Sequence, residues 1–293
     1  MANLKEIRVR IASVNSTQQI TKAMKMVSAA KLRRAQDAII QMRPFAKKLH
    51  EIIANVSGTL DSSTGGAYAQ VRPVKRVLII AVTSNRGLCG GFNTNIIRTI
   101  NAMIRDNYSA QAKEGNVKVL CIGKKASDYF SKNKSLFLES HNDVYNGLSF
   151  DKVAPVAESV MKEFAEGNYD KVELVYNMFK NAAVQYVTRE QVLPIMPPEK
   201  KDDSKLKNDF IFEPNKEEIV LELIPKSIRV QIYKATLDSH ASEHGARMTA
   251  MNKATDNAGE LLSNLRLYYN KARQAAITGE ILEIVGGANA LKG

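Results

Sequence analysis

Residues 258–276 read AGELLSNLRLYYNKARQAA, and their spacing decides how the chain is built. Apolar or small side chains recur there at alternating steps of four and three residues, at Ala258, Leu262, Leu265, Tyr269, Ala272 and Ala276. A repeat of this kind is typical of a coiled-coil seam, along which one helix packs against another. The sequence therefore predicts a long C-terminal helix that has a helical partner.

The partner helix is expected at the N-terminus, where Ile7, Ile11 and Val14 begin a similar seam. Polar residues interrupt that seam at 17–19. The seam is then predicted to resume in a displaced position through Ile20, Met24 and Val27. After a second shift it is predicted to continue through Leu32, Ala35, Ile39 and Met42. Shifts of this kind change the winding of a helix pair locally without ending the helix.

Helix-breaking residues are concentrated in the middle of the chain, with Pro44 the only Pro in the N-terminal segment. No Gly precedes Gly58, and no Pro lies between residues 226 and 293. Gly, Ser and Pro clusters predict a linker and a mobile loop. The resulting division is an N-terminal coiled-coil helix over 1–57, a linker over 58–73, a middle domain over 74–195, a mobile loop and helix start over 196–214, and a C-terminal coiled-coil helix over 215–293.

The middle of the chain alternates strand and helix patterns. Short β-branched runs at 74–83 and 116–122 predict buried strands, as in a parallel sheet, and further strands are predicted at 171–176 and 184–187. Helical periodicity predicts helices at 95–108 and 153–164. Strands that alternate with helices indicate an α/β domain.

The predicted C-terminal helix is too long for this domain to cover. The roughly 120 residues of the middle domain form a globule about 35 Å across, whereas the helix is expected to be on the order of 100 Å long. Its far end is also apolar, with Ile277, Ile281, Ile284 and Val285 on one face. An apolar face that the chain cannot cover indicates a partner protein.

The net charge of +12 is concentrated at the N-terminus, because residues 1–50 hold eleven Lys or Arg against two acids. This excess predicts an acidic partner: nucleic acid, an anionic membrane surface or an acidic protein groove. No segment approaches the roughly 20 apolar residues of a membrane span, and no secretory signal is expected at the N-terminus. Cys89 and Cys121 form no spaced framework, which favours a reducing compartment.

Two segments resemble parts of catalytic or ligand-binding motifs. His240-Ala-Ser-Glu243-His244 matches the H-x-x-E-H pattern of zinc enzymes, but a third ligand would have to come from elsewhere, so we interpret these residues as solvated or interhelical. The loop at 84–93, SNRGLCGGFN, follows a strand as phosphate-binding loops do, yet it lacks their glycine spacing. Cys89 has no His near it in sequence, and turn glycines explain the composition of the loop. We therefore predict no catalytic residue, no cofactor and no metal.

Five segments, in the order given, resemble the gamma subunits of rotary F-type ATP synthases. They are residues 11–27 (IASVNSTQQITKAMKMV), 84–93 (SNRGLCGGFN), 210–214 (FIFEP), 245–257 (GARMTAMNKATDN) and 269–278 (YNKARQAAIT). The resemblance implies a fold of the class α/β plus long α. In this fold the N- and C-terminal helices form an antiparallel coiled coil, and a Rossmann-like α/β domain lies between them in the sequence. The resemblance covers essentially the whole chain.

The resemblance also implies a function and partners. Such a subunit is a central rotor that couples proton-driven rotation of the membrane ring to ATP synthesis at catalytic sites on the beta subunits. Its implied partners are the alpha and beta subunits of the hexamer, the epsilon subunit and the c-subunit ring, with no nucleic acid. The implied location is the cytoplasmic face of the bacterial plasma (inner) membrane, with membrane association indirect through the ring. A basic coiled-coil protein that binds nucleic acid is the alternative, and a nucleotide-dependent enzyme is a third hypothesis.

Residues of the matching segments are implied contacts with the hexamer. They are Arg273, Gln274 and Thr278 near the end of the last helix, Met24, Lys25 and Arg247 on the helix pair, and Arg86 and Cys89 on the loop at 84–93. Two positions depart from the family pattern. Asn85 replaces the more usual Asp, which removes a possible partner for Arg86. Gly279 interrupts the last helix at a cost of about 1 kcal/mol relative to Ala.

Overall fold

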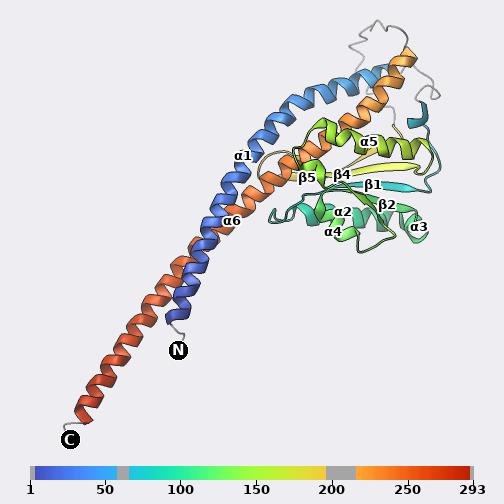
Figure 1. Cartoon of the computed structure of the whole chain (residues 1–293). Helices are drawn as coiled ribbons and strands as arrows, with labels where there is room; N and C mark the ends of the chain where they lie inside the picture. The colour runs from blue at the N-terminus through green and yellow to red at the C-terminus, as the bar shows by residue number, and fades with distance from the viewer. Residues whose placement is uncertain (1–3, 58–65, 196–215, 291–293) are drawn as a thin grey trace. The chain divides into compact units, whose positions relative to one another are not determined.

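The computed structural model of the chain describes residues 4–57, 66–195 and 216–290. These residues form two compact units (Figure 1). The first, which we call the coiled-coil unit, joins residues 1–28 to residues 247–293. The second, the α/β unit, comprises residues 29–246.

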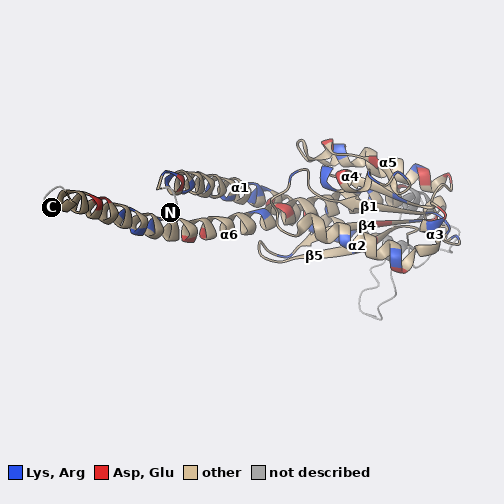
Figure 2. Cartoon of the chain, turned by 90° about the horizontal axis from the view of Figure 1, so that it is seen from below, with Lys and Arg blue, Asp and Glu red and all other residues tan. Residues whose placement is uncertain are grey.

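The two long helices that the sequence predicts each contribute residues to both units. Helix α1 spans Leu4–Ser57 and helix α6 spans Lys216–Ala290. In the coiled-coil unit the two helices lie side by side and run antiparallel (Figures 1 and 2), because Arg8 reaches Tyr269 whereas Lys25 reaches Asn252. The pairing and direction of the helices confirm the expected coiled coil.

The seam of α1 is continuous, and the predicted displacement through Ile20, Met24 and Val27 is wrong. Ile20 is 59% exposed and Val27 is 57% exposed. One set of buried and half-buried positions keeps alternating steps of four and three residues throughout: Ile7, Ile11, Val14, Gln18, Thr21, Lys25, Ser28, Leu32, Ala35, Ile39, Met42, Ala46 and Leu49. Polar side chains occupy part of the seam, so a search for apolar residues alone misplaces it.

The seam of α6 in the coiled-coil unit confirms the prediction and extends it in both directions. Its buried and half-buried positions are Met251, Thr255, Ala258, Leu262, Leu265, Tyr269, Ala272, Ala276 and Gly279. Near the N-terminus of α1, the Arg8 guanidinium donates a hydrogen bond to the Tyr269 hydroxyl at 2.7 Å and lies 5.7 Å from the centre of its ring. This contact joins the two helices beside the first turns of α1.

The α/β unit is built on a five-stranded sheet of order β3-β2-β1-β4-β5. The strands are β1 (Val77–Val82), β2 (Val117–Ile122), β3 (Phe137–Ser140), β4 (Lys171–Phe179) and β5 (Gln185–Leu193). Strands β1 and β2 are parallel, as predicted, and β3 and β4 run parallel to them, whereas β5 pairs antiparallel with β4. The sheet is therefore mixed, because β5 follows β4 through a short connection.

The described residues contain six shorter helical elements, of which η1 precedes the first strand and the other five lie between strands. These elements are η1 (Gly66–Tyr68), α2 (Phe92–Asn107), α3 (Ser109–Lys113), α4 (Lys124–Phe130), η2 (Asp143–Tyr145) and α5 (Phe150–Ala165). The sequence predicts α2 and α5 but not α3, α4 or β3. Part of the predicted linker, residues 58–65, and the predicted mobile loop at 196–214 lie outside the described residues.

The sheet is covered on both faces, so that strands β1, β2 and β4 are almost entirely buried. Side chains of α2 and α4, among them Ile96 and Phe130, pack on the face that carries Ile79. Side chains of α5 pack on the opposite face, which carries Ile80. Helix α6 joins this second layer through Ile224, Ile228, Ile232 and Ala235. The composition of the sequence separates both long helices from the middle domain. In the structure, part of each long helix instead belongs to the same compact unit as the sheet.

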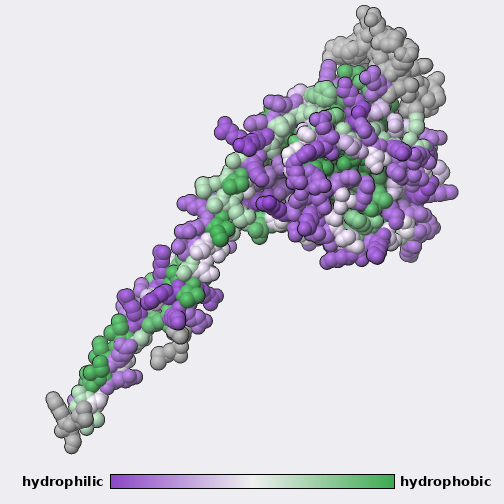
Figure 3. All heavy atoms as spheres, viewed as in Figure 1, coloured by the Kyte–Doolittle hydropathy of each residue, from purple (hydrophilic) through white to green (hydrophobic). Residues whose placement is uncertain are grey.

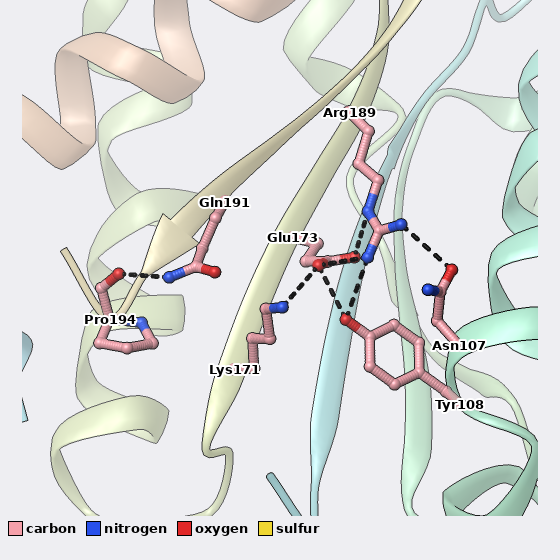
Figure 4. A network of polar contacts seen from close by, with 7 residues as sticks. All are labelled: Asn107, Tyr108, Lys171, Glu173, Arg189, Gln191 and Pro194. Carbon is pink, nitrogen blue, oxygen red and sulfur yellow. Dashed lines mark hydrogen bonds and ion pairs between the residues drawn. The ribbon is translucent and has the colours of Figure 1, made fainter. Parts of the chain in front are cut away.

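A buried carboxylate ties β4 to β5 and to the end of α2 (Figure 4). The Glu173 side chain is only 2% exposed, and it accepts hydrogen bonds from Arg189 at 2.7 and 2.9 Å and from the Tyr108 hydroxyl at 2.7 Å. Lys171 lies 3.1 Å from the same carboxylate. Burial alone would raise the pKa of Glu173, but hydrogen bonds from Arg189, Tyr108 and Lys171 outweigh it and hold that pKa below its ordinary value.

In the part of the chain that the structure describes, no helix carries an apolar stretch able to cross a membrane.

Candidate functional site

The seam of the coiled-coil unit contains a polar layer, formed by Gln18, Thr21 and Lys25 of α1 with Asn252 and Thr255 of α6. The Thr255 hydroxyl donates to the Thr21 hydroxyl at 2.8 Å, and the Lys25 ammonium donates to the Asn252 side-chain oxygen at 2.5 Å. The Gln18 amide donates to the Thr255 carbonyl at 3.4 Å. Polar groups inside a helix seam reduce stability but favour one register, because only one register pairs them.

Three predicted contact residues belong to this part of the coiled-coil unit. Met24 and Lys25 are half-buried, and Arg247 is only 7% exposed. The ammonium of Lys25 already donates within the helix pair. A partner that reaches these residues would therefore meet side chains that are largely held in place.

The C-terminal part of α6 carries the other predicted contacts of this unit. Arg273, Gln274 and Thr278 are exposed and flank the half-buried seam positions. Every side chain from 280 to 290 is exposed. Large apolar side chains are among the exposed ones (Figure 3), namely Ile277, Ile281, Leu282, Ile284 and Val285. A continuous apolar surface of this kind fits a protein partner that encloses the helix end.

The loop at 84–93 is a rigid turn in the α/β unit. The Asn93 side chain accepts a hydrogen bond from the Ser84 amide at 3.0 Å and donates to the Ser84 hydroxyl at 2.8 Å and to the Cys89 sulfur at 3.2 Å. Cys89 is only 1% exposed, so it supports the loop from beneath. Arg86 is exposed, and Leu88 is 65% exposed with a φ of 62°. A non-glycine residue with positive φ persists only where its surroundings fix it.

Asn85 takes a role that an Asp could not fill. Its side-chain amide donates to the Asn142 carbonyl at 2.9 Å, and its side-chain oxygen accepts from the Lys124 backbone amide at 2.9 Å. A carboxylate lacks the donor for the first of these bonds. Asn85 therefore fastens the loop to α4 and to the segment before η2.

Within the H-x-x-E-H segment, Glu243 and His244 are buried and His240 is half-buried, so of the two interpretations, solvated or interhelical, the solvated one does not hold for Glu243 and His244. Glu243 is 7% exposed and His244 is 5% exposed. The rings of His240 and Tyr145 stack at 5.8 Å with an interplanar angle of 22°. Burial follows from the position of α6, which packs on the α/β unit at this point. Among the described residues no group of three His, Cys, Asp or Glu side chains could hold a metal ion.

A groove of about 970 Å³ lies in the α/β unit between α1, β5 and α6. Its lining is partly apolar, and it contains the ion pair of Arg43 and Asp238 at 3.1 Å. The second side-chain oxygen of Asp238 is buried without a hydrogen-bond partner. Burial raises the pKa of Asp238 despite the hydrogen bond from Arg43.

Sequence comparisons match the chain over its full length. A family model described as ATP synthase matches residues 3–291. A gamma chain of ATP synthase from Flavobacterium johnsoniae is 58% identical over 293 residues, which cover 100% of both chains. The gamma chain from Chloroherpeton thalassium is 47% identical and covers 100% of this chain and 99% of its own length.

Solved structures share the fold. A chain of the mitochondrial ATP synthase of Euglena gracilis, in an assembly described as OSCP, F1 and c-ring, matches with a TM-score of 0.69 at 22% identity, covering 98% of this chain and 94% of its own. A chain from the central stalk and c-ring of the Tetrahymena thermophila enzyme matches with a TM-score of 0.59 at 26% identity, covering 80% of this chain and 99% of its own. With its paired long helices, its mixed five-stranded sheet and these full-length relatives, the chain belongs to the ATP synthase gamma chain family.

Proposed function

We propose that this chain is the central rotor of a bacterial ATP synthase, which couples proton-driven rotation of a membrane ring to ATP synthesis at catalytic sites on the beta subunits. The observation that carries the proposal is the full-length match to gamma chains at up to 58% identity. The coiled-coil unit gives this match a physical basis, because its α6 end has exposed apolar and polar side chains for a partner to enclose.

The rotor acts by contacts that differ around its surface. A ligand or partner shifts a two-state equilibrium only by the difference in its affinity for the two states, and a swing from 1:99 to 99:1 requires roughly 5.5 kcal/mol. A few ionic or hydrogen-bonding side chains supply a difference of that size. Arg273, Gln274 and Thr278 are suited to such contacts, because they are exposed on a helix whose seam holds it in a fixed rotation.

The apolar end of α6 is suited to turning inside a collar. Apolar contacts are non-directional, so an apolar collar resists rotation less than a ring of hydrogen bonds would. On the α/β unit, Arg86 and the exposed Leu88 form a second contact region on a loop that its own hydrogen bonds hold rigid. Cys89 supports that region from below. Met24, Lys25 and Arg247 contribute where the acidic lever segment of a beta subunit approaches the helix pair.

The partners proposed for this rotor are the alpha and beta subunits of the hexamer, the epsilon subunit and the c-subunit ring. The chain itself is proposed to be non-catalytic and to bind no cofactor. The complex would lie on the cytoplasmic face of the plasma membrane, with this chain attached through the ring. The relatives described above are gamma chains, so the alternatives of a nucleic-acid binder and a nucleotide-dependent enzyme find no support.

Co-purification tests the proposal. A tagged copy of the chain, expressed in its own cells, is expected to bring down an assembly that hydrolyses ATP and contains two larger subunits in equal number. Isolation of the tagged chain without any ATP-hydrolysing partner would refute the rotor assignment. Retention on DNA that weakens steeply as salt rises would instead favour the nucleic-acid alternative.

A second experiment tests the contact residues separately. The double variant Arg273→Ala, Gln274→Ala is expected to assemble but to lose coupled turnover, because the exposed side chains contact the hexamer and not the rotor's own fold. Lys271→Ala is the matched control, since Lys271 is also exposed on α6 within the same turn. If both variants retain full turnover, Arg273 and Gln274 are not rotor–stator contacts, although the chain could still be the rotor.

A further inference from the structure

His240 and His244 lie one helical turn apart on α6, and their Nε2 atoms are 3.2 Å apart. The two rings meet edge to face, with centroids 4.6 Å apart and an interplanar angle of 83°. Two imidazole nitrogens bound to one tetrahedral zinc ion, each at ~2.0–2.1 Å, are roughly 3.3 Å from each other. The pair therefore already has the spacing of two ligands on a single metal ion.

The surroundings hold both rings in this arrangement. Tyr145 of η2 stacks on the His240 ring, and His244 is only 5% exposed. His240 is half-buried, which leaves a side of the pair open to solvent. Because packing fixes the side chains in advance, a metal ion would lose little affinity to the ordering of its ligands.

We propose that His240 and His244 together bind one transition-metal ion through their Nε2 atoms, with Cu²⁺ bound most tightly and Ni²⁺ and Zn²⁺ less so. Imidazole ligands suit these ions, and the order of affinity follows the Irving–Williams series. Water completes the coordination shell, because no third His, Cys, Asp or Glu of the described residues joins the pair. The site is therefore an exchangeable one, unlike a four-ligand structural zinc site.

Metal binding replaces the contact between the two rings. In the present geometry one Nε2 donates a proton toward the other. Coordination through both Nε2 atoms requires the donating ring to carry its proton on Nδ1 instead. The bound ion then links positions four residues apart and stiffens one turn of α6 beside Tyr145. This site differs from a catalytic zinc site, which has three protein ligands, because among the described residues it has two.

Titration of the full-length chain with Cu²⁺ alone, followed by electron paramagnetic resonance, tests the proposal. One equivalent of Cu²⁺ is expected to bind with hyperfine coupling from two imidazole nitrogens. His240→Gln and His244→Gln should each weaken binding and remove one nitrogen from the spectrum. The matched control is the double variant His50→Gln, His141→Gln, which removes the other two histidines and should leave the spectrum unchanged.

Thermal unfolding gives a second readout. Ni²⁺ or Zn²⁺ is expected to raise the Tm of the wild-type chain but not of either Gln variant, because an ion that binds only the folded state stabilises it. Mg²⁺, which prefers oxygen ligands, should not raise it. A spectrum of the wild-type chain with one imidazole or none would overturn the proposal even if the variants failed to fold. Binding that His240→Gln and His244→Gln leave unchanged would overturn it as well.

Discussion

The hydroxyl groups of Thr21 on α1 and Thr255 on α6 are 2.8 Å apart at the centre of the polar layer that interrupts an otherwise apolar seam. Thr255 also lies 2.8 Å from the Met251 carbonyl, and Thr21 donates to the Gln18 carbonyl. Thr21 donates its proton within α1, so the single hydroxyl proton of Thr255 is shared between the Thr21 hydroxyl and the Met251 carbonyl. We therefore expect the loss of both hydroxyls together to change the free energy of unfolding little.

The first prediction concerns this pair. Thr21→Val should lower the free energy of unfolding by about 1 kcal/mol, because it removes the acceptor between the helices but leaves Thr255 a bond to Met251. The double variant with Thr255→Val should cost less than the two single variants added together, since apolar groups of the same shape replace both partners. Urea unfolding of the four proteins measures the coupling. Strictly additive costs would show that the hydroxyls do not interact.

The second prediction concerns the buried carboxylate. Glu173→Gln should lower the free energy of unfolding at neutral pH by about 2–3 kcal/mol, below the upper range for a fully buried pair, because Arg189 and Lys171 are partly exposed. The pKa of Glu173 is lower in the folded chain than its ordinary value of 4.5. The contribution of the ionised Glu173 to the free energy of unfolding is therefore complete when the pH is above the ordinary pKa. It is lost as the pH falls through the lower pKa of the folded chain.

Unfolding curves from neutral pH down to about pH 3 measure this difference. The gap between the wild-type chain and Glu173→Gln should narrow on acidification. Glu166→Gln is the control, because Glu166 is an exposed member of a surface pair and should show little cost at any pH. A gap that stays constant across the acid range would mean that Glu173 is not held ionised by its neighbours.

The third prediction concerns Gly279, which occupies a seam position near the end of α6. A Cβ added there would meet no atom within 4 Å, so Gly279→Ala should stabilise the helix by about 1 kcal/mol. Gly259→Ala is the matched control, since its Cβ would lie 3.0 Å from the Gln18 amide and gain less or nothing. Circular dichroism during thermal unfolding measures both. Equal gains would show that the Gln18 side chain moves aside freely.

The fourth prediction concerns Asn85. Asn85→Asp should lower the free energy of unfolding by about 1–3 kcal/mol, because a carboxylate beside the Asn142 carbonyl has no proton to donate. The loop at 84–93 should exchange its amide hydrogens faster as a result. Hydrogen-exchange mass spectrometry on the loop peptide gives the measurement. Unchanged exchange and stability would mean that the Asn142 contact does not hold the loop.

Most of the fold can be predicted from the sequence, because its long helices and strands have regularly spaced apolar residues. The seam from Ala258 to Ala276 and the β-branched runs of β1 and β2 lie where their periodicity places them. The seam of α1 is harder to predict, because Gln18, Thr21 and Lys25 occupy core positions that a hydrophobicity pattern assigns to neighbouring residues. Their role depends on polar partners of α6 that lie more than two hundred residues away in the sequence.

The candidate site is only partly readable from the sequence. Exposed Arg273 and Gln274 follow from the helical pattern, since they flank seam residues. The burial of Cys89 and of His244 does not, because it depends on which elements pack over them. The positive φ of Leu88 also gives no sequence signal, as glycine is the residue expected in that conformation.

The unbroken seam of α1 has a consequence for torque. A repeat of 3.5 residues falls short of the helical period of about 3.6, so the paired helices of the coiled-coil unit wind around each other in a left-handed sense. Twisting the pair further in that sense tightens the contact between the helices, whereas twisting it in the opposite sense opens the contact. The resistance of the helix pair to twisting therefore depends on the direction in which it is turned.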